Sequence, residues 1–368
     1  MSKAAVFVGQ DQPLVIRTDV EVEAPHAHEV KVRMGASGVC HSDLSMTNGT
    51  MMAFPPLILG HEGAGVIEEV GEGVTNVKVG DHVVVSWVPQ CGDCFFCQKG
   101  QGHLCENANA ALGANALLDG TTRAKSEGAP LPQMAGAGTF SEVSVLPDTA
   151  VVKIDDDVDM RVAALIGCGV LTGTGAAMNT ADIKPGDTVA VVGCGGVGLN
   201  VIQGARIKGA KEIIAVDMVE SKLQMAKEFG ATATVNASQG DPVAQVQQMT
   251  GGRGVDVAFE VIGLGATIDQ TINMARRGGQ AILVGVPKMD VMVTVPAFFG
   301  VVLSEKTIKG CWYGSSNVQQ DVPKLVALYK SGELKLDELI SRTISLEEVN
   351  DAFDAMKTGE VARSVIAY

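Results

Sequence analysis

Residues 188–198 read Thr-Val-Ala-Val-Val-Gly-Cys-Gly-Gly-Val-Gly, which joins a strand signal directly to a glycine loop. The β-branched run at 188–192 predicts a buried strand, and the residues after it match G-x-G-x-x-G at the start of a helical stretch. The first glycine of this pattern makes the turn, the second lets the backbone approach a pyrophosphate, and the third lets helix and strand pack. The loop therefore predicts a dinucleotide site at the positive end of the helix, formed by Gly193, Gly195, Gly196, Val197 and Gly198.

The next strand signal, at 212–217, ends in an acidic residue. Asp217 lies 24 residues after Gly193, where a carboxylate can accept hydrogen bonds from the ribose hydroxyls of adenosine. A 2′-phosphate at this point would face a negative charge, so the sequence favours NAD over NADP. Asp217 could also cap the helix that follows, which is compatible with a binding role.

The glycine loop opens a regular alternation of strand and helix signals. This alternation predicts a parallel sheet wrapped by helices, that is, a Rossmann domain of α/β class over residues 173–311. The expected strands are 188–192, 212–217, 232–236, 255–259 and 280–284, and the expected helices are 197–208, a stretch ending at 229, 243–249 and 266–276.

The rest of the chain has a different pattern. Short alternating runs such as 30–33 and 82–85 are separated by turns dense in glycine, which is typical of a small distorted barrel. After the Rossmann segment the sequence predicts helices at 322–330 and 346–356 and a strand at 364–368. Because 368 residues exceed what one core usually organises, we expect a second domain from residues 1–172 and 312–368.

Composition narrows the class of partner. The formal net charge is -14 and no Lys/Arg-rich block occurs, which argues against nucleic acid as the main partner. A dinucleotide remains compatible, because backbone N–H groups can hold phosphates. The start of the chain lacks the pattern of a signal peptide, and no window approaches 18 uninterrupted apolar residues. We therefore expect a cytoplasmic protein that does not span a membrane.

Four of the eight cysteines lie close together, and the spacing is C-x2-C-x2-C-x7-C. Cys91, Cys94, Cys97 and Cys105 could surround one tetrahedral zinc and leave no open position. Iron–sulfur binding is the rival, but the ferredoxin pattern continues C-x3-C-P, whereas here the last gap is seven residues and no proline follows. Four unrelated buried thiols are the remaining alternative. The expected lobe covers about residues 88–112.

Three further candidate ligands are dispersed. Cys40, His61 and Cys168 each lie at or beside a glycine, where the backbone can bend so that ligands converge. The residues alone do not show that the three meet. Cys168 could be a small core residue, and His61 could be a core histidine whose nitrogens are satisfied.

The chain resembles the zinc-containing medium-chain dehydrogenase/reductase family over essentially its whole length. The segment Gly60-His-Glu-x2-Gly65-x5-Gly71-x2-Val74 resembles the zinc signature of that family, and the cysteine lobe, the glycine loop and the Cys168 segment occur in its order and spacing. Within the family the chain is most similar to the long-lobe alcohol dehydrogenases, which include the thiol-dependent formaldehyde dehydrogenases. The resemblance implies that the second domain is a β-rich, GroES-like catalytic domain.

The resemblance also implies ligands and catalytic groups. Cys40, His61 and Cys168 would hold a catalytic zinc with a fourth position for water or alcohol, so that each subunit has two zinc ions. Asp43 corresponds to the carboxylate that orients the zinc-bound histidine, and Glu62 to a glutamate that can bind the metal transiently.

The implied reaction is reversible hydride transfer between a primary alcohol, medium-chain or aromatic, and NAD, giving the aldehyde. Ser42 corresponds to the hydroxyl that contacts the substrate oxygen and takes its proton. Many family members have a histidine three residues later, where this chain has Ser45. Because serine is not a base at neutral pH, the outer proton route must use water or another group.

Further residues are placed by the resemblance alone. His41 and Arg363 correspond to basic positions at the pyrophosphate, and Lys222 lies beside the adenosine ribose. The cofactor-binding positions implied around the nicotinamide and nearby are Thr172, Val197, Ile262 and Val286. The implied substrate pocket consists of Ser42, Trp87, Ala110, Met134, Ala135, Val286 and Trp312. For His41 and Lys222 an exposed position without a role is the alternative.

Two rival functions remain open. A thiol-dependent formaldehyde dehydrogenase would act on a carboxylate-bearing adduct of glutathione or mycothiol and needs a cation at the pocket mouth. Asn109 stands where the glutathione-dependent subfamily carries an arginine. A cofactor-binding protein without turnover would be favoured by loss of a zinc ligand, and none is lost. The segment 111–130 resembles an insertion found in dimeric members, which predicts a homodimer.

Overall fold

The computed structural model describes residues 1–358 and 362–368, and it divides the chain into two compact units. The first unit combines Met1–Gly169 with Asn317–Tyr368, and the second is Val170–Ser316. The sequence predicts the divisions at 172/173 and 311/312. Thr172 and Trp312, which this prediction places in the first domain, therefore belong to the second unit.

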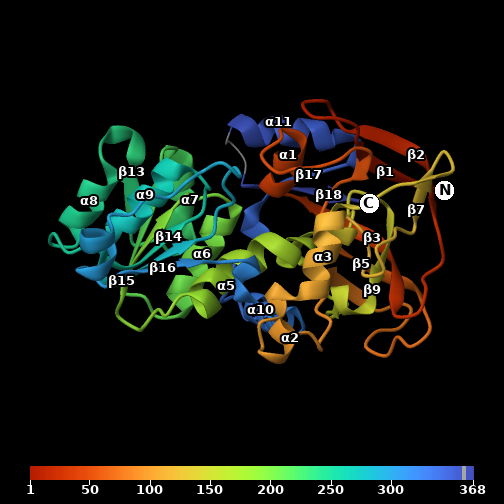
Figure 1. Ribbon diagram of the computed structural model, residues 1–368, viewed down its shortest axis with the longest axis horizontal. Coiled ribbons are helices and arrows are strands. Elements are labelled where there is room, and N and C mark those ends of the chain that lie inside the picture. Colours follow the sequence, from red (N-terminus) through yellow and green to blue (C-terminus); the bar gives the residue numbers. More distant parts are fainter. Residues whose placement is uncertain (359–361) are drawn as a thin grey trace. The chain divides into compact units, whose positions relative to one another are not determined.

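The second unit is built on a six-stranded sheet in which each neighbouring pair is parallel (Figure 1). The strand order is β13-β12-β11-β14-β15-β16. The chain starts at the centre of the sheet, builds outward to β13, and returns to build the other half, so the order reverses between β11 and β14. Ligands of open α/β sheets bind beyond the carboxyl ends of the strands at such a point. The strands are β11 Thr188–Val192, β12 Glu212–Asp217, β13 Ala233–Asn236, β14 Val255–Glu260, β15 Ala275–Leu283 and β16 Thr307–Gly310.

Helices connect these strands, as the alternating pattern predicts. They are α6 Gly196–Ile207, α7 Glu220–Glu228, α8 Pro242–Met249 and α9 Gly265–Met274. The central strands β11, β12 and β14 are mostly apolar and buried because helices cover the sheet. Ile214 and Val216 of β12, for example, are 1% exposed and pack with Val192 and Val246 in one buried cluster.

Two details of this unit differ from the prediction. Helix α9 ends at Met274 and not at 276, because Ala275 adopts an extended backbone and pairs with Val255 as the start of β15. The sequence also predicts no strand at Thr307–Gly310, whereas β16 forms the sheet edge there. Three of the four β16 residues are exposed, so the strand lacks the apolar signal of a buried one.

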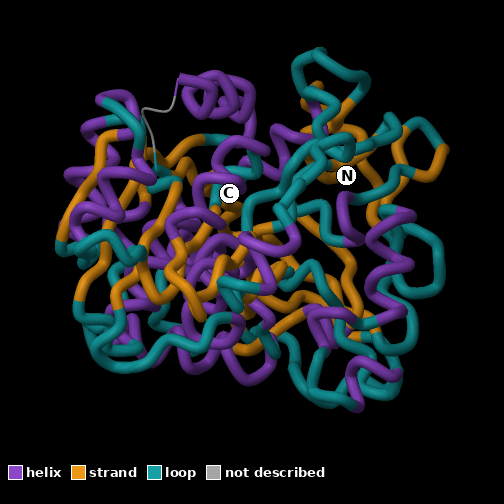
Figure 2. Tube along the Cα trace, turned by 60° about the vertical axis from the view of Figure 1, so that its left-hand side comes forward, coloured by secondary structure: helices purple, strands orange, loops and turns teal. Residues whose placement is uncertain are grey.

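The first unit is rich in antiparallel strands that long loops connect (Figure 2). One sheet has the order β4-β1-β2-β7-β8, and the other has the order β10-β6-β5-β3-β18-β17 with β9 also paired to β3. The strands are β1 Ser2–Phe7, β2 Val15–Val22, β3 Glu29–Val39, β4 Leu57–Ile58, β5 Glu62–Val70, β6 His82–Val85, β7 Ala124–Ser126, β8 Ala129–Pro130, β9 Val143–Pro147, β10 Val151–Lys153, β17 Ile340–Ile344 and β18 Arg363–Ala367. The helices are α1 His41–Thr47, α2 Phe95–Gln98, α3 Glu106–Ala114, α4 Met160–Leu165, α10 Val318–Lys330 and α11 Val349–Thr358.

Helix α10 begins four residues before the predicted 322, although Pro323 lies inside it. The carboxylate of Asp321 accepts a hydrogen bond from the backbone N–H of Asn317 at 3.0 Å, which anchors the start of the helix. A proline in a helix interior removes one backbone hydrogen bond, and the helix forms here despite that loss.

A continuous helical stretch, Met160–Thr180, contains α4, α5 Leu171–Gly175 and two π-helical segments. Its 21 residues and mean hydropathy of 1.4 would suffice for a membrane span, although the sequence predicts none. The apolar window is 83% buried within the protein, as in the core helix of a folded domain. One π-helical segment, Ile166–Val170, carries Cys168.

Candidate active site

Four potential metal ligands converge in the first unit. The ligand atoms of Cys40, His61, Glu62 and Cys168 all lie within 4.8 Å of one another, and all four residues are buried. Pairing of β3 with β5 places Gly38 opposite Glu62, so the chain that leads to Cys40 runs beside the chain that follows His61. A Cβ at Gly38 would lie 2.1 Å from Glu62 Oε2. The glycine is therefore needed for close approach.

Asp43 holds two members of this cluster. Its Oδ2 accepts the backbone N–H of Cys40 at 2.9 Å, and its Oδ1 lies 2.9 Å from His61 Nδ1. Asp43 is fully buried. The bond at Nδ1 leaves Nε2 of His61 as the nitrogen that can bind a metal, and in the described structure this buried Nε2 has no hydrogen-bond partner. A carboxylate behind a ligating histidine is the usual support of a metal-bound imidazole, so the residues fit a metal ion.

The charges of the cluster follow from its contacts. The neighbouring thiol of Cys168 lowers the pKa of Cys40 well below its ordinary value against the effect of burial, and His61 contributes in the same direction. Burial opposes the charged imidazole of His61, but Asp43 and Cys40 outweigh it and raise the pKa of His61 to about 10. Zinc requires thiolates and a neutral imidazole, so metal binding here would release protons.

Glu62 lies in the cluster with both carboxylate oxygens occupied. Oε2 pairs with the guanidinium of Arg363, and Oε1 accepts the backbone N–H of Gly169 at 3.0 Å. Glu62 is fully buried and Arg363 is 7% exposed. The structure thus places Arg363 beside the metal cluster, and its predicted role at a pyrophosphate stays a prediction.

The predicted catalytic and pocket residues of the first unit are placed as follows. Ser42 is partly buried on α1, and its Oγ lies 3.9 Å from Cys40 Sγ. The ring of Trp87 is 8% exposed and stands edge-on to the ring of His61, with centroids 6.3 Å apart. His41 is exposed at the start of α1, Ser45 is half-buried on the same helix, and Met134 and Ala135 are buried in a short helical turn.

Ala110, a predicted pocket residue of this unit, lies on an exposed helix face. Ala110 is exposed on α3, whose buried residues are Ala108 and Ala111. The helix turns its other face inward, and the role of Ala110 in the substrate pocket stays a prediction.

The four lobe cysteines form a second cluster. The sulfurs of Cys91, Cys94, Cys97 and Cys105 lie within 4.8 Å of one another, and the Cys91–Cys97 and Cys94–Cys105 pairs are 3.9 Å apart. Tetrahedral ligation at a Zn–S distance of about 2.3 Å requires sulfurs about 3.8 Å apart, so the geometry fits one zinc ion.

The thiols of this lobe have unequal proton affinities. Backbone hydrogen bonds from the Cys97 and Glu106 amides lower the pKa of Cys94 to about 6, whereas burial raises the pKa of Cys91 to about 12. Only Cys105 of the four is buried, and none of the eight cysteines forms a disulfide. A zinc ion would keep the four sulfurs as thiolates.

In the second unit the glycine loop has the geometry of a phosphate cradle. Gly193 has a φ of +101°, and a Cβ at Gly198 would lie 1.9 Å from the Gly193 carbonyl oxygen. A Cβ at Gly195 would meet no atom within 4 Å, which leaves open space over the loop. Helix α6 has no side-chain cap at its start, so its first backbone N–H groups are available to an anion.

Asp217 closes the same edge of the sheet. Its Oδ2 accepts the backbone N–H of Cys194 at 2.9 Å, and its Oδ1 accepts the N–H of Val219 at 3.0 Å. The cap of α7 is Val219, so Asp217 is not the helix cap itself. Lys222 is half-buried on α7, and Ile262 and Val286 are 44% and 43% exposed. Thr172 and Val197 are half-buried, and Trp312 is 37% exposed.

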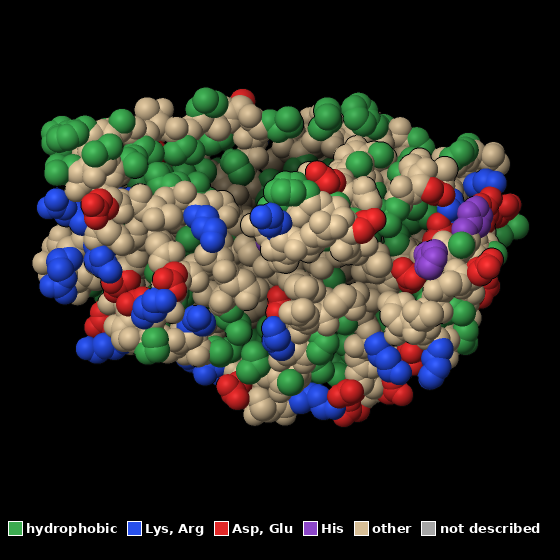
Figure 3. Space-filling view, turned by 60° about the horizontal axis from the view of Figure 1, so that its bottom comes forward, with side chains coloured by type: hydrophobic (Ala, Val, Ile, Leu, Met, Phe, Trp, Pro, Cys, Tyr) green, Lys and Arg blue, Asp and Glu red, His purple; other side chains and the backbone are tan. Residues whose placement is uncertain are grey.

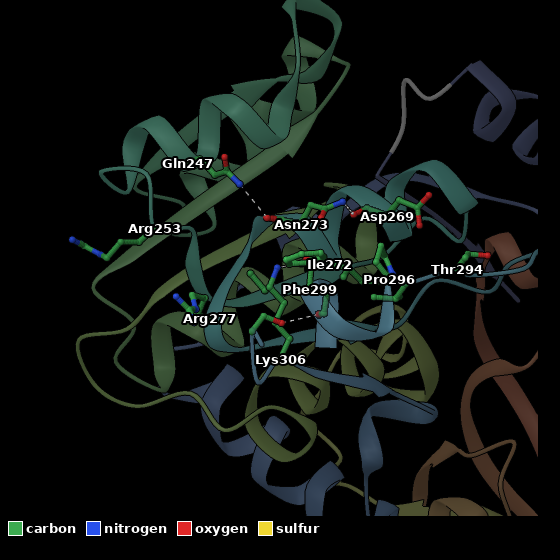
Figure 4. Close-up of a pocket in the computed structure, with 14 residues that line it drawn as sticks. Gln247, Arg253, Asp269, Ile272, Asn273, Arg277, Thr294, Pro296, Phe299 and Lys306 are labelled. Carbon is green, nitrogen blue, oxygen red and sulfur yellow. Dashed lines mark hydrogen bonds between the residues drawn. The ribbon is translucent and has the colours of Figure 1, made fainter. Parts of the chain in front are cut away.

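A cavity of about 480 Å³ in the second unit lies away from these residues (Figure 4). Its lining includes Arg253, Ala275 and Lys306, which stand at the amino ends of β14, β15 and β16, opposite the glycine loop. The Nζ of Lys306 donates to the Ile272 carbonyl at 2.8 Å, and Gln247 donates to the Asn273 carbonyl at 3.3 Å. These groups cap the end of α9, and no predicted site residue lines the cavity.

Two protein families match most of the chain. A family described as "Zinc-binding dehydrogenase" matches residues 196–331, and one described as "Alcohol dehydrogenase GroES-like domain" matches residues 26–156. A Mycobacterium tuberculosis protein provisionally named alcohol dehydrogenase D is 38% identical over 99% of both chains. These matches confirm the predicted fold class, a Rossmann-like domain with a GroES-like domain.

Solved structures of similar proteins have the same fold. The benzyl alcohol dehydrogenase of Acinetobacter calcoaceticus is 31% identical with a TM-score of 0.94, covering 100% of this chain and 99% of that one. A zinc-binding-domain alcohol dehydrogenase protein of Burkholderia ambifaria is 34% identical with a TM-score of 0.94, covering 100% and 98%. A zinc-binding dehydrogenase structure from Sinorhizobium meliloti, solved with NADP, is 27% identical with a TM-score of 0.81, covering 100% and 99%.

The two clusters predict separable metal contents. Replacing Cys168 with serine should lower the zinc content from two ions per chain to one and abolish turnover, because the buried cluster loses a ligand while the lobe keeps all four. Metal analysis of the purified protein measures this. The matched control is Cys311→Ser, a buried cysteine outside both clusters, which should keep both ions. Pure, active protein without zinc would contradict the assignment.

Proposed function

The chain belongs to the zinc-dependent medium-chain alcohol dehydrogenase family, and from this we propose that it interconverts primary alcohols, medium-chain or aromatic, and their aldehydes with NAD. The observation that carries the proposal is the buried convergence of Cys40, His61 and Cys168, with Asp43 behind the histidine and Ser42 beside the cysteine. Three protein ligands with a hydroxyl nearby are the arrangement of a catalytic zinc site, which keeps a position for substrate.

A zinc ion held by these three residues would supply a Lewis acid at the alcohol oxygen. We propose that Ser42 receives the proton of the alcohol and passes on its own, since a hydroxyl can accept one hydrogen bond and donate another. Asp43 keeps the imidazole of His61 in one orientation. Because Ser45 replaces a base farther out, we propose that water carries the proton to solvent.

NAD would supply the hydride acceptor. The glycine loop would bind its pyrophosphate through backbone N–H groups, at the open face of Gly195 and the uncapped start of α6. Asp217 supports NAD over NADP, because its carboxylate accepts hydrogen bonds from sugar hydroxyls and repels a phosphate. The NADP in the Sinorhizobium meliloti structure belongs to that protein.

The choice of primary, larger alcohols is supported by the apolar surroundings. Trp87 is a broad, buried ring beside His61, and such a ring favours an extended or aromatic substrate. Met134 and Ala135 are also buried. The likeness to a benzyl alcohol dehydrogenase supports the aromatic part of the proposal.

We further propose a homodimer, and the second unit offers a surface for it. Eight large hydrophobic side chains between residues 289 and 303 are exposed, and Figure 3 shows hydrophobic side chains gathered over part of this unit. Contiguous apolar surface of this kind is typical of an interface, and two copies can cover it with the same patch from each. The exposed residues are Met289, Met292, Val293, Phe298, Phe299, Val301, Val302 and Leu303.

Cofactor choice should depend on Asp217. In the wild type, catalytic efficiency with NAD should exceed that with NADP, and Asp217→Gly should weaken NAD and relieve the penalty on NADP. Steady-state kinetics with both cofactors measures this. Asp241→Gly removes a carboxylate from the cap of α8 in the same unit and should leave the ratio unchanged. Equal efficiency with both cofactors in the wild type would overturn the prediction.

Substrate preference should follow chain length. Each buried methylene contributes about 0.8 kcal/mol, so catalytic efficiency should rise several-fold per carbon until the pocket is full. The measurement is a series from ethanol through butanol and hexanol to benzyl alcohol, with a mycothiol–formaldehyde adduct alongside. Trp87→Ala should flatten the series. Efficiency that falls with chain length would contradict the apolar pocket, and activity on the adduct alone would assign the thiol-dependent reaction.

The dimer has a direct test in light scattering. The mass should be twice the 38.1 kDa of one chain. Met292→Asp should lower it towards one chain, because the charge would be buried in the interface. Met52→Asp is the matched control, since Met52 is an exposed methionine of the first unit. A mass near four chains would exclude the dimer.

A further inference from the structure

Glu260, the last residue of β14, is a buried carboxylate to which neither the metal clusters nor the glycine loop gives a role. It is fully buried, and no salt bridge to it occurs among the described residues. Burying a carboxylate is costly unless hydrogen bonds compensate. The hydrogen bonds that Glu260 accepts must therefore offset the lost hydration of its carboxylate.

Three donors converge on one oxygen of Glu260. Its Oε1 accepts the backbone N–H of Ile262 at 2.9 Å, the N–H of Gly263 at 2.8 Å and the hydroxyl of Thr267 at 2.7 Å. Oε2 has no partner in the described structure. The carboxylate thus fixes the turn between β14 and α9 through Oε1 alone.

This turn packs against two other segments predicted to bind the cofactor, the glycine loop and the segment of Val286. A Cβ at Gly193 would lie 2.6 Å from Ile262 Cγ1, so Ile262 packs directly on the first glycine of the loop. A Cβ at Gly263 would lie 2.4 Å from the Val286 carbonyl oxygen. Glycine at both positions allows an approach that no larger residue could make, and a shift of the turn would move all three segments.

We propose that Glu260 is a positioning residue of the dinucleotide site. The hydrogen bonds to its Oε1 fix the turn at Ile262 and Gly263, and this turn holds Ile262 against the glycine loop and Gly263 against the backbone of Val286. The inference rests on the proposed cofactor binding. Glu260 itself does not touch the dinucleotide. Ile262 is 44% exposed and Val286 is 43% exposed, which leaves both residues available to a ligand, while Glu260 fixes the backbone of Ile262.

The test is NADH and NADPH affinity, measured by fluorescence titration of the folded, zinc-loaded protein. Glu260→Ala removes the shared acceptor and should weaken NADH binding about tenfold, since it strands three donors. Glu260→Gln keeps an oxygen acceptor and should stay within about threefold of the wild type. Thr267→Val removes one donor and should weaken binding about threefold.

Thr271→Val is the matched control. Thr271 is buried one turn later in α9, and its hydroxyl donates only to the Thr267 carbonyl, so this variant should bind NADH as the wild type does. Zinc content and thermal unfolding are measured for every variant. Should Glu260→Ala fail to fold, the NADH affinities of Thr267→Val and Glu260→Gln, compared with that of Thr271→Val, decide whether Glu260 has the positioning role.

Wild-type affinity in Glu260→Ala, or equal loss in Thr267→Val and Thr271→Val, would overturn the positioning role while leaving the proposed function intact. A wild type that binds neither NADH nor NADPH would overturn both.

Discussion

The buried carboxylate of Asp43 positions two of the potential metal ligands, Cys40 and His61. It begins helix α1, because it accepts the N–H of Cys40 in a capping box, and with its other oxygen it orients His61. The same buried group therefore fixes a local helix start and a contact between residues 18 positions apart. A buried carboxylate needs such donors to offset its lost hydration. The hydrogen bonds that stabilise Asp43 in the fold are therefore the same ones that position the ligands.

The strand pairing of β3 and β5 supplies the second constraint. It brings the glycines before Cys40 against the segment that follows His61, and the absence of a side chain at Gly38 leaves the space that the Glu62 carboxylate fills. Arg363, on β18 next to β3, neutralises that carboxylate. These three strands thus bring Glu62 and Arg363 together beside Cys40 and His61, although Arg363 lies 301 positions from Glu62 in the sequence.

Local patterns predicted the second unit well. Its β-branched runs and glycine turns act over a few residues, so strand positions and the cradle at Gly193 could be derived from the sequence. The edge strand β16 could not, because most of its residues are exposed and lack an apolar pattern.

Contacts between residues far apart in the sequence limited how much of the site could be predicted. The Glu62–Arg363 pair joins residues 301 positions apart, and no spacing rule anticipates it. The convergence of Cys40, His61 and Cys168 was accessible only by resemblance, because each lies on a separate element. The resemblance also did not reveal which face of α3 is turned inward, and Ala110 lies on the exposed face.

The cysteine lobe has a consequence for the durability of the molecule. Three of its four sulfurs are only half-buried, and the pKa of Cys94 near 6 keeps that sulfur a thiolate at neutral pH. Thiolates are the species that oxidants attack, and a neighbouring thiol then closes a disulfide. The Cys91–Cys97 and Cys94–Cys105 sulfurs are 3.9 Å apart, so each thiol has a partner close by. Chelation followed by exposure to air would therefore oxidise the empty lobe to a disulfide form that cannot take up zinc until a reductant restores the thiols.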